Sequence, residues 1–324
     1  MGAHTWTSDA AVGVYKNHAI TNQLLVTATG KCKVAQFARE FPGNEGKTFK
    51  GKGETVNIMH VKEPSAPTSY LLDESTKIPI TKMELGNRAA TIAEWGRGMS
   101  YTDLNQQLSK FKPNSYLQKG LMRDMTNGLD DAAAAAFTST DVKIIFIPTS
   151  LTSGTFDTDG TPSTVATANL TQAHIGVLAD YLAGNIHCPP FEGDDYICLS
   201  CRKTLRGLKD DQLLEKIHLY LRKGEMFFVG EVGKLENIRF IQIDRETAIS
   251  NTAGTSTVLG DAVVFGDQAV GYAEALSPQL YADPDHQKDF ERVKAIAWRG
   301  DFVYASIWNT ATDGEAKIIR IGSA

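Results

Sequence analysis

The segment KPNSYLQKGLMRDMTNGLDDAAAAAF carries the clearest helical pattern in this chain of 324 residues. Pro113 suits the first turn of a helix, and Asn114 is a candidate N-cap. Leucine or methionine then recurs at every fourth position, which gives the helix one apolar face. The alanines at 132–136 allow another element to approach closely. We predict a spine helix of about two dozen residues, roughly 35 Å long, with Leu117, Leu121, Met125 and Leu129 on its apolar face.

A two-stranded finger is predicted just before this helix, over residues 47–98. In ETVNIMHVK, alternation places Val56, Ile58 and His60 on one face of a strand. The segment EPSAPTSYLLDESTKIP has three prolines and many small polar residues, which is typical of an exposed tip. The segment ITKMELGNRAATIAEWGRG predicts the returning strand. Residues 1–46 show no sustained period and predict an extended arm.

The rest of the chain predicts an α+β fold in which strands dominate the second half. VKIIFIP, residues 142–148, predicts a short buried strand followed by a polar loop. A helix is expected from a Thr171 cap to Gly184, with Gly184 as the residue just past its end. A third helix is expected over 209–223. Further strands are expected at residues 194–201, 236–243, 262–265, 291–298, 302–308 and 316–321.

The segment VGEVGKLENIRFIQI contains two glycines three residues apart, followed by a lysine. It is not a P-loop, because Phe228 stands where the first glycine is needed and Leu235 where a hydroxyl is needed. A GxxG clamp for RNA would join two helices and would not place an acid against the RNA backbone. The pattern therefore favours a structural turn at Gly230 and Gly233.

No motif of an enzyme or of a metal site stands out. The histidines are scattered, and no HExxH, GxSxG or GxGxxG pattern is complete. Cys198 and Cys201 form a CxxC, but they fall on a predicted strand that turns them to opposite faces, which favours buried thiols over zinc. Asp157 and Asp159 begin like a calcium loop, whose later ligands are missing. We expect no catalytic residue, no cofactor and no metal; an enzyme whose site assembles only in space stays the alternative.

Charge is distributed unevenly along the chain. The formal net charge is -5, yet the first 97 residues carry an excess of Lys and Arg over Asp and Glu, and the rest of the chain is acidic. Such unlike regions favour self-association over sequence-specific binding of nucleic acid, which requires a strongly basic face. No stretch approaches eighteen apolar residues, so we expect no membrane span, and the first residues lack the pattern of a secretory signal.

Taken in order, these segments resemble tailed-bacteriophage major capsid proteins with the Hong Kong 97-type fold, and more narrowly the N-four-like podovirus branch. The resemblance covers about residues 50–321 and is carried by KIPITKMELGNRAATIAEWGRGMSYTDL, VGEVGKLENIRFIQI, AVVFGDQAVGYA and DFERVKAIAWRGDFVYASIWNTATDGEAKIIRI. It implies an α+β Hong Kong 97-like fold with an N-terminal arm at 1–46, an E-loop at 47–98, the P-domain spine helix at 99–144, an A-domain at 145–285 and returning P-domain strands at 286–324.

The resemblance also implies a function. The chain would self-assemble as hexamers and pentamers into the icosahedral head around double-stranded DNA, which it would contact weakly and without sequence preference. A separate scaffolding protein and a portal would be partners, with or without a decoration protein; assembly would take place in the bacterial host cytoplasm and the product would reside in the virion. An encapsulin-like compartment and a globular α+β enzyme are the alternatives. In such proteins the Gly230 and Gly233 turn would lead into a strand that buries Ile238, Phe240 and one or both of Ile241 and Ile243.

The finger is expected to bind a neighbouring subunit. A two-stranded hairpin is marginal in water by itself, so it must gain burial from another surface. Because the finger is basic and the rest of the chain acidic, charge complementarity is expected to help seat it; the alternative is that the lysines only solubilise an exposed edge. The predicted contact residues are Lys47, Lys50, Lys52, Arg88 and Arg97.

Overall fold

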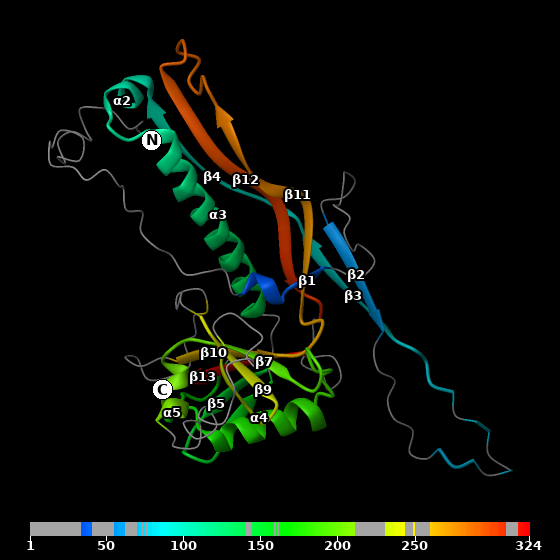
Figure 1. The fold of residues 1–324 in the computed structure, drawn as a ribbon. Helices are drawn as coiled ribbons and strands as arrows, with labels where there is room; N and C mark the ends of the chain where they lie inside the picture. The colour runs from blue at the N-terminus through cyan, green and yellow to red at the C-terminus, as the bar shows by residue number, and fades with distance from the viewer. Residues whose placement is uncertain are drawn as a thin grey trace.

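A long helix and two sheets organise the part of the chain that the structure describes (Figure 1). A four-stranded sheet runs beside the helix, a seven-stranded sheet lies at the helix's C-terminal end, and a two-stranded hairpin projects to the side. This computed structural model describes residues 34–40, 55–61, 70–72, 74, 77–78, 80–139, 144–158, 160, 162–210, 231–243, 249, 260–308 and 317–324.

The predicted spine helix is confirmed as α3 (Pro113–Phe137). Its N-cap is Lys112 and not the predicted Asn114, because Pro113 occupies the first helical position, where its missing N–H costs nothing. A short helix, α2 (Asp103–Leu108), precedes α3.

The four-stranded sheet covers the apolar face of α3. Leu117 and Leu121 are buried against Trp298 and Phe302, so the four-residue period of the sequence marks the contact correctly. The sheet has the order β1-β11-β12-β4. Its strands are β1 (Arg39–Glu40), β11 (Val270–Asp283), β12 (Val293–Ser306) and β4 (Ala93–Thr102).

One continuous strand, β12, replaces two predicted strands. The expected break at 299–301 is absent, and β12 runs through it while pairing with β11 on one side and β4 on the other. Gly300 lies in the middle, where a Cβ would come within 2.9 Å of Pro278 on β11. The glycine is therefore needed for the close approach of two strands and does not mark a turn.

The seven-stranded sheet has a buried layer on each face. One face packs against helix α4 (Gln172–Gly184), and the other packs against the last turns of α3. The sheet has the order β6-β5-β13-β10-β7-β9-β8. Its strands are β6 (Gly154–Asp157), β5 (Ile145–Pro148), β13 (Ile318–Ser323), β10 (Gly260–Phe265), β7 (Tyr196–Ser200), β9 (Ile238–Gln242) and β8 (Glu231–Leu235).

The predicted second helix is confirmed as α4. Thr171 is its N-cap as predicted, and the Thr171 N–H lies 3.0 Å from Nδ1 of His174 in a capping box. Gly184 is the last helical residue, and Asn185 is the C-cap. The residues that face the sheet are Ile175, Leu178 and Leu182.

Several elements were not predicted. Helix α5 (Thr204–Lys209), together with β6, β8 and β11, has no counterpart in the sequence analysis. The helix predicted at 209–223 falls almost entirely outside the described residues. The strands predicted at 142–148, 194–201, 236–243, 262–265 and 316–321 are confirmed within a few residues as β5, β7, β9, β10 and β13.

The predicted glycine turn is wrong for Gly233. This residue lies inside β8 opposite Phe240, next to a register shift, while Gly230 falls outside the described residues. The chain turns instead at Glu236 and Asn237, whose φ angles of 48° and 59° suit a two-residue hairpin. The expected burial on the following strand is confirmed for Ile238, Phe240, Ile241 and Ile243.

A short piece of the predicted arm joins the two sheets. The 3-10 turn η1 (Ala35–Phe37) lies on α3, where the Asp130 carboxylate accepts the N–H groups of Val34 at 2.7 Å and Ala35 at 3.2 Å. Phe37 packs edge-on against Phe265 of the seven-stranded sheet, and β1 pairs with β11 of the four-stranded sheet. These seven described residues, 34–40, thus contact the spine helix and both sheets.

For three strands, the sheet to which the strand belongs differs from the one expected from the predicted domain ranges. β4, mostly within the predicted finger at 47–98, belongs to the four-stranded sheet. β11 falls in the predicted A-domain range but also joins the four-stranded sheet, whereas β13, predicted as a returning P-domain strand, lies in the seven-stranded sheet. The domain assignment itself stays a prediction.

Candidate assembly surface

The base of the predicted finger is a regular hairpin. Strands β2 (Thr55–Val61) and β3 (Leu85–Thr91) pair antiparallel along their whole length. Burial alternates residue by residue along β2, as the sequence predicted. The inward side chains are Val56, Ile58 and His60.

The inner face of this hairpin is covered by its own chain. Val56, Ile58 and Ala90 form one cluster with Ala273 of β11 and Ile307, just after β12. The expectation that the finger must take all of its burial from a neighbour is therefore wrong for the base. Its outer face is exposed, and so are the described residues beyond it, 70–72, 74, 77–78 and 80–84.

His60 fixes the angle at which the hairpin leaves the body. Its ring lies 4.8 Å from that of Trp308, and on the other side it fills the space over Gly86, where any Cβ would overlap the imidazole. The Trp308 indole donates to the Gln268 carbonyl at 2.9 Å, which anchors the contact to the body. The finger therefore leaves the body from a packed base.

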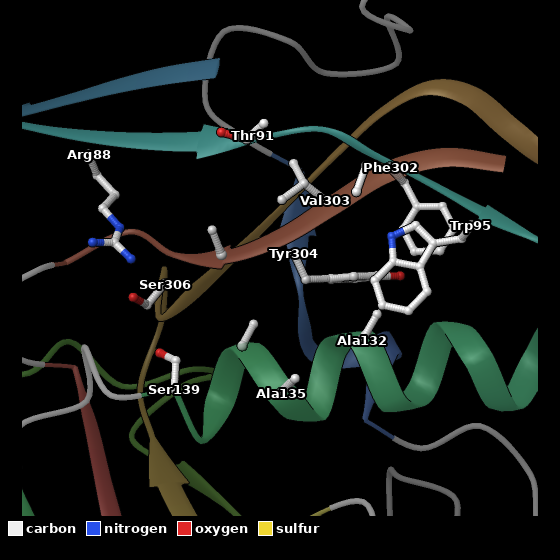
Figure 2. Close-up of a pocket in the computed structure, with 13 residues that line it drawn as sticks. Arg88, Thr91, Trp95, Ala132, Ala135, Ser139, Phe302, Val303, Tyr304 and Ser306 are labelled. Atoms are coloured by element: carbon white, nitrogen blue, oxygen red, sulfur yellow. The ribbon is translucent and has the colours of Figure 1, made fainter. Parts of the chain in front are cut away.

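A cavity of about 310 Å³ opens between the finger base, β12 and α3 (Figure 2). Small side chains of α3, such as Ala132 and Ala135, form its floor, and Trp95 and Tyr304 line its apolar end. Arg88 of β3 lies at the other end, on the side of Ser139 and Ser306. The cavity thus has one apolar and one polar end.

The structure places two of the five predicted contact residues, and both face their own chain. Arg88 lines the cavity just described. Arg97 lies on β4, outside the hairpin, and its guanidinium is 2.9 Å from the Asp124 carboxylate of α3. Lys47, Lys50 and Lys52 lie outside the described residues. Seating of the finger by charge therefore stays a prediction that depends on these three lysines.

Large apolar side chains are exposed along the finger. Ile80 is 96% exposed and Leu71 is 89% exposed, although each would gain free energy on leaving water. Monomeric proteins rarely expose so many neighbouring apolar groups, so the surface favours a protein partner. Between residues 55 and 91, the described members of this set are Met59, Val61, Tyr70, Leu71, Leu72, Ile78, Ile80, Met83 and Leu85.

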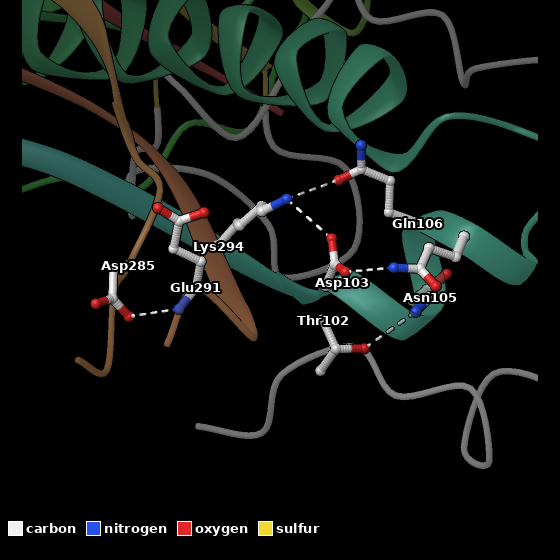
Figure 3. Close-up of polar contacts among 8 residues, drawn as sticks. Thr102, Asp103, Asn105, Gln106, Asp285, Glu291 and Lys294 are labelled. Atoms are coloured by element: carbon white, nitrogen blue, oxygen red, sulfur yellow. Dashed lines mark hydrogen bonds and ion pairs between the residues drawn. The ribbon is translucent and has the colours of Figure 1, made fainter. Parts of the chain in front are cut away.

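The far end of the four-stranded sheet carries a second exposed feature (Figure 3). The Asp103 carboxylate accepts from Lys294 at 2.9 Å, and this hydrogen bond lowers the pKa of Asp103. The Asp285 carboxylate accepts the N–H of Glu291 at 3.2 Å and so shapes the loop between β11 and β12. Phe290 in that loop is 93% exposed at a φ of 49°, an unfavourable backbone for a non-glycine residue.

This loop is a candidate contact. Strained residues persist only where the surrounding structure determines them, and they cluster at functional sites. Here the strained residue presents a whole aromatic ring to solvent. The loop therefore joins the finger as a surface that suits a protein partner.

The described residues show no cluster of side chains that would hold a metal ion. Cys188, Cys198 and Cys201 are buried free thiols. Burial raises the pKa of Cys188 to about 11 and raises that of Cys198 further. Thiols held in this protonated form are poor nucleophiles and poor metal ligands. None of the described helices has the length and apolar character that a membrane span needs.

Comparison with known proteins points to one class of structure. No family model matches the sequence, and no curated protein matches it. Solved structures do match. The capsid chain of cyanophage Pam1 aligns at a TM-score of 0.69 and 16% identity, covering 95% of this chain and 96% of that one. The fold is that of a phage capsid chain.

Two further phage structures support this fold. The capsid chain of Ralstonia phage GP4 aligns at a TM-score of 0.67 and 12% identity, over 95% of this chain and 94% of that one. The capsid chain of Helicobacter pylori bacteriophage KHP30 aligns at 0.66 and 11% identity, over 100% and 98%. The predicted Hong Kong 97-like α+β fold is therefore confirmed over nearly the full length.

Sequence reasoning looked for charge on the finger and missed its apolar side chains. A signal was present, because Tyr70, Leu71 and Leu72 interrupt a stretch of prolines and small polar residues. Phe290 gave a weaker signal, since a single aromatic residue in a charged loop is common. Its exposure depends on a positive φ angle, which no local sequence pattern predicts.

Proposed function

We propose that this chain is the major capsid protein of a tailed bacteriophage. Its hexamers and pentamers close into an icosahedral shell around double-stranded DNA, and the product resides in the virion. The observation that carries this proposal is the match to phage capsid chains over 95% or more of this chain. The exposed apolar finger supports it, because an isolated globular enzyme gains nothing from such a projection. The role is structural and not enzymatic.

The narrower parts of the proposal rest on the sequence resemblance. The order of the matching segments supports the N-four-like podovirus branch. The same resemblance supports a portal as a partner and assembly in the host cytoplasm, and a separate scaffolding protein is part of the proposal.

The finger provides the contact between subunits in this proposal. Its inner face is bound to its own chain at the base, so the outer face and the exposed residues beyond it bind the neighbour. Burying a large apolar side chain fully contributes about 1.5–3 kcal/mol. Each exposed ion pair from Lys47, Lys50 or Lys52 adds only about 0.2–1 kcal/mol. Apolar burial therefore outweighs charge in this contact.

Electron microscopy of the purified protein tests the proposal. We expect closed shells or capsomers from the natural sequence. Ile78→Ser with Ile80→Ser should reduce the yield of shells strongly while leaving the melting temperature of the subunit nearly unchanged, since both side chains are exposed. The matched control is Leu151→Ser with Val165→Ser, two exposed apolar residues off the finger, which should assemble normally.

Changing Lys47, Lys50 and Lys52 to Glu should reduce the yield less, and more at low salt than at high salt. A 35.3 kDa monomer at every concentration would contradict the capsid proposal. Shells that hold protein cargo and no DNA would favour an encapsulin-like compartment instead.

A further inference from the structure

We propose that the outward face of the first half of α3 is the surface that contacts packaged DNA. This inference rests on the proposed function, which supplies double-stranded DNA as the polyanion. It goes beyond that function by assigning the contact to named residues on one face of one helix.

The charge of this segment is one-sided. Residues 104–123 contain four Lys or Arg and no Asp or Glu. The acids of the helix begin only at Asp124, whose carboxylate is engaged on the sheet side by Arg97 and by the Trp298 indole, each at 2.9 Å. The next acid, Asp130, is buried and accepts backbone N–H groups from the arm segment. Asp124 and Asp130 are therefore both engaged away from Lys112 and Lys119.

Helical geometry gathers the basic residues on one line. Successive residues turn by about 100°, so Lys112, Lys119 and Arg123 fall within an arc of about 40°. That arc lies opposite Leu117 and Leu121, which are buried against the sheet. Lys112 and Lys119 are exposed to solvent, and Arg123 is half-buried.

The neighbours of this line suit a phosphate backbone. Ser115 is exposed, lies about 60° from this line around the helix, and supplies a neutral donor beside the lysines. The positive end of the helix dipole lies at the same end of α3, where it favours anions. Lys112 and Lys119 are about 10 Å apart along the axis. Each DNA strand carries a charge every 3.4 Å or so, so the row meets phosphates at any register.

The chemistry predicts weak binding without sequence preference. Flexible lysine side chains meet phosphates as point charges and do not read base edges in a fixed geometry. Such contacts give dissociation constants of about 10⁻⁴ to 10⁻⁶ M at physiological salt. Weak, reversible contacts of this kind suit a shell whose DNA must be able to move in and out.

The salt dependence of binding provides the test. Unassembled subunits are titrated into a fluorescent DNA duplex of about 20 base pairs, with salt varied from about 50 to 200 mM. We expect Lys112→Gln with Lys119→Gln to lower the slope of log K against log salt by about 2, since each lost phosphate contact removes about 1. The matched control is Arg202→Gln with Lys203→Gln, which removes the same charge from exposed positions beside the seven-stranded sheet and should leave the slope unchanged.

Two results would overturn the proposal. The first is an unchanged slope in the Lys112 and Lys119 variant, with circular dichroism confirming that it is folded; if that variant also loses shell assembly, the face binds an acidic protein and not DNA. The second is an equal fall in the control, which would show an effect of net charge alone. A loss of slope in a protein that never forms shells would instead support the DNA surface and count against the capsid function.

Discussion

The two halves of α3 share one inner face and differ on the outer face. Along the inner face, Leu117 and Leu121 pack on the four-stranded sheet, and Ala132 continues the same contact. On the outer face, Ala133, Ala134 and Phe137 are buried under the arm segment and the seven-stranded sheet. Lys112 and Lys119 of the first half are exposed instead. A single helix thus works as a structural joint at one end and presents a charged surface at the other.

This difference shows how the outer face of a helix is specified. A run of alanines allows two sheets and an arm to meet at one end, because a methyl group keeps the elements close. Lysines at the other end keep their charge in water and let their stems lie on the surface. The same helical propensity therefore serves two roles, which only the outward side chains distinguish.

The largest test of the comparison is Phe137→Ala in the second half. Phe137 is fully buried, with its ring 4.6 Å from that of Phe265. Loss of a buried phenylalanine should lower the free energy of unfolding by about 3–5 kcal/mol. Urea unfolding of the unassembled subunit would measure it. Met122→Ala, at an exposed position of the first half, is the control and should change it by less than about 0.5 kcal/mol. Equal effects at the two positions would remove the distinction between the halves.

Asp130→Asn should have an intermediate effect. The carboxylate is buried and accepts two backbone N–H groups from residues 96 and 95 positions away. Replacing it with a neutral amide of the same shape weakens two hydrogen bonds that are worth about 1.5–3 kcal/mol each while the acceptor is charged. In limited proteolysis, the chain should also be cleaved faster on the N-terminal side of Phe37, because the arm segment is no longer held by the Asp130 carboxylate. The control is Asp180→Asn on the exposed side of α4, which should change neither the free energy of unfolding nor the rate of cleavage. If the arm segment of the Asp130 variant is cleaved no faster than that of the natural sequence, the Asp130 hydrogen bonds are not needed to hold it.

Lys119→Gln should have the smallest effect on folding. The side chain is exposed, and no pair holds it in the described part of the chain, so the free energy of unfolding should change by less than about 0.5 kcal/mol. Differential scanning calorimetry of the subunit would measure the melting temperature. A loss above about 1 kcal/mol would show that the first half is covered in the folded chain, and the contrast between the halves would then fail.

The sequence predicted the inner face of α3 because leucines at a four-residue period are a local signal. It could not predict the outer joint. The hydrogen bond between Asp130 and Val34 joins residues that are 96 positions apart in the sequence. The alanines can pack against many different elements, so their positions do not indicate which one. Burial on the outer face depends on which distant segment arrives there, which no local pattern encodes.

The strands show the same limit. β11 was missed because Ser277 and Pro278 interrupt its alternation, and both lie at register shifts in the structure. β12 was divided in two because Arg299, Gly300 and Asp301 have the composition of a turn. The two irregularities lie opposite each other, because Pro278 of β11 packs closely on Gly300 of β12. A pair of compensating irregularities on separate strands is invisible when either strand is considered alone.

The end of the predicted finger shows a related limit. Residues 85–102 form an extended chain with one residue, Ile92, between β3 and β4. The sequence predicts one returning strand for these residues. In the structure, β3 pairs with β2 within the hairpin, whereas β4 pairs with β12 of the four-stranded sheet. Arg97 therefore belongs to the body, although sequence placed it on the finger. The change of partner occurs within a single extended segment, without the glycine or proline that usually marks a boundary.

β12 also determines how the subunit bears mechanical load. This strand begins beside the exposed loop at one end of the body and ends beside the finger base, and it is bonded on both flanks to β11 and β4 over most of its length. A pull along the line from loop to finger acts parallel to the strand, so many hydrogen bonds must yield together instead of opening one after another. A force across that line acts instead on the side-chain packing at the finger base, where His60 contacts Trp308 and the inner face of the hairpin packs on Ala273 and Ile307. The chain is therefore expected to be stiff under tension along β12, with the finger base as its softer joint; in the proposed shell this would let it carry tension between the loop and the finger.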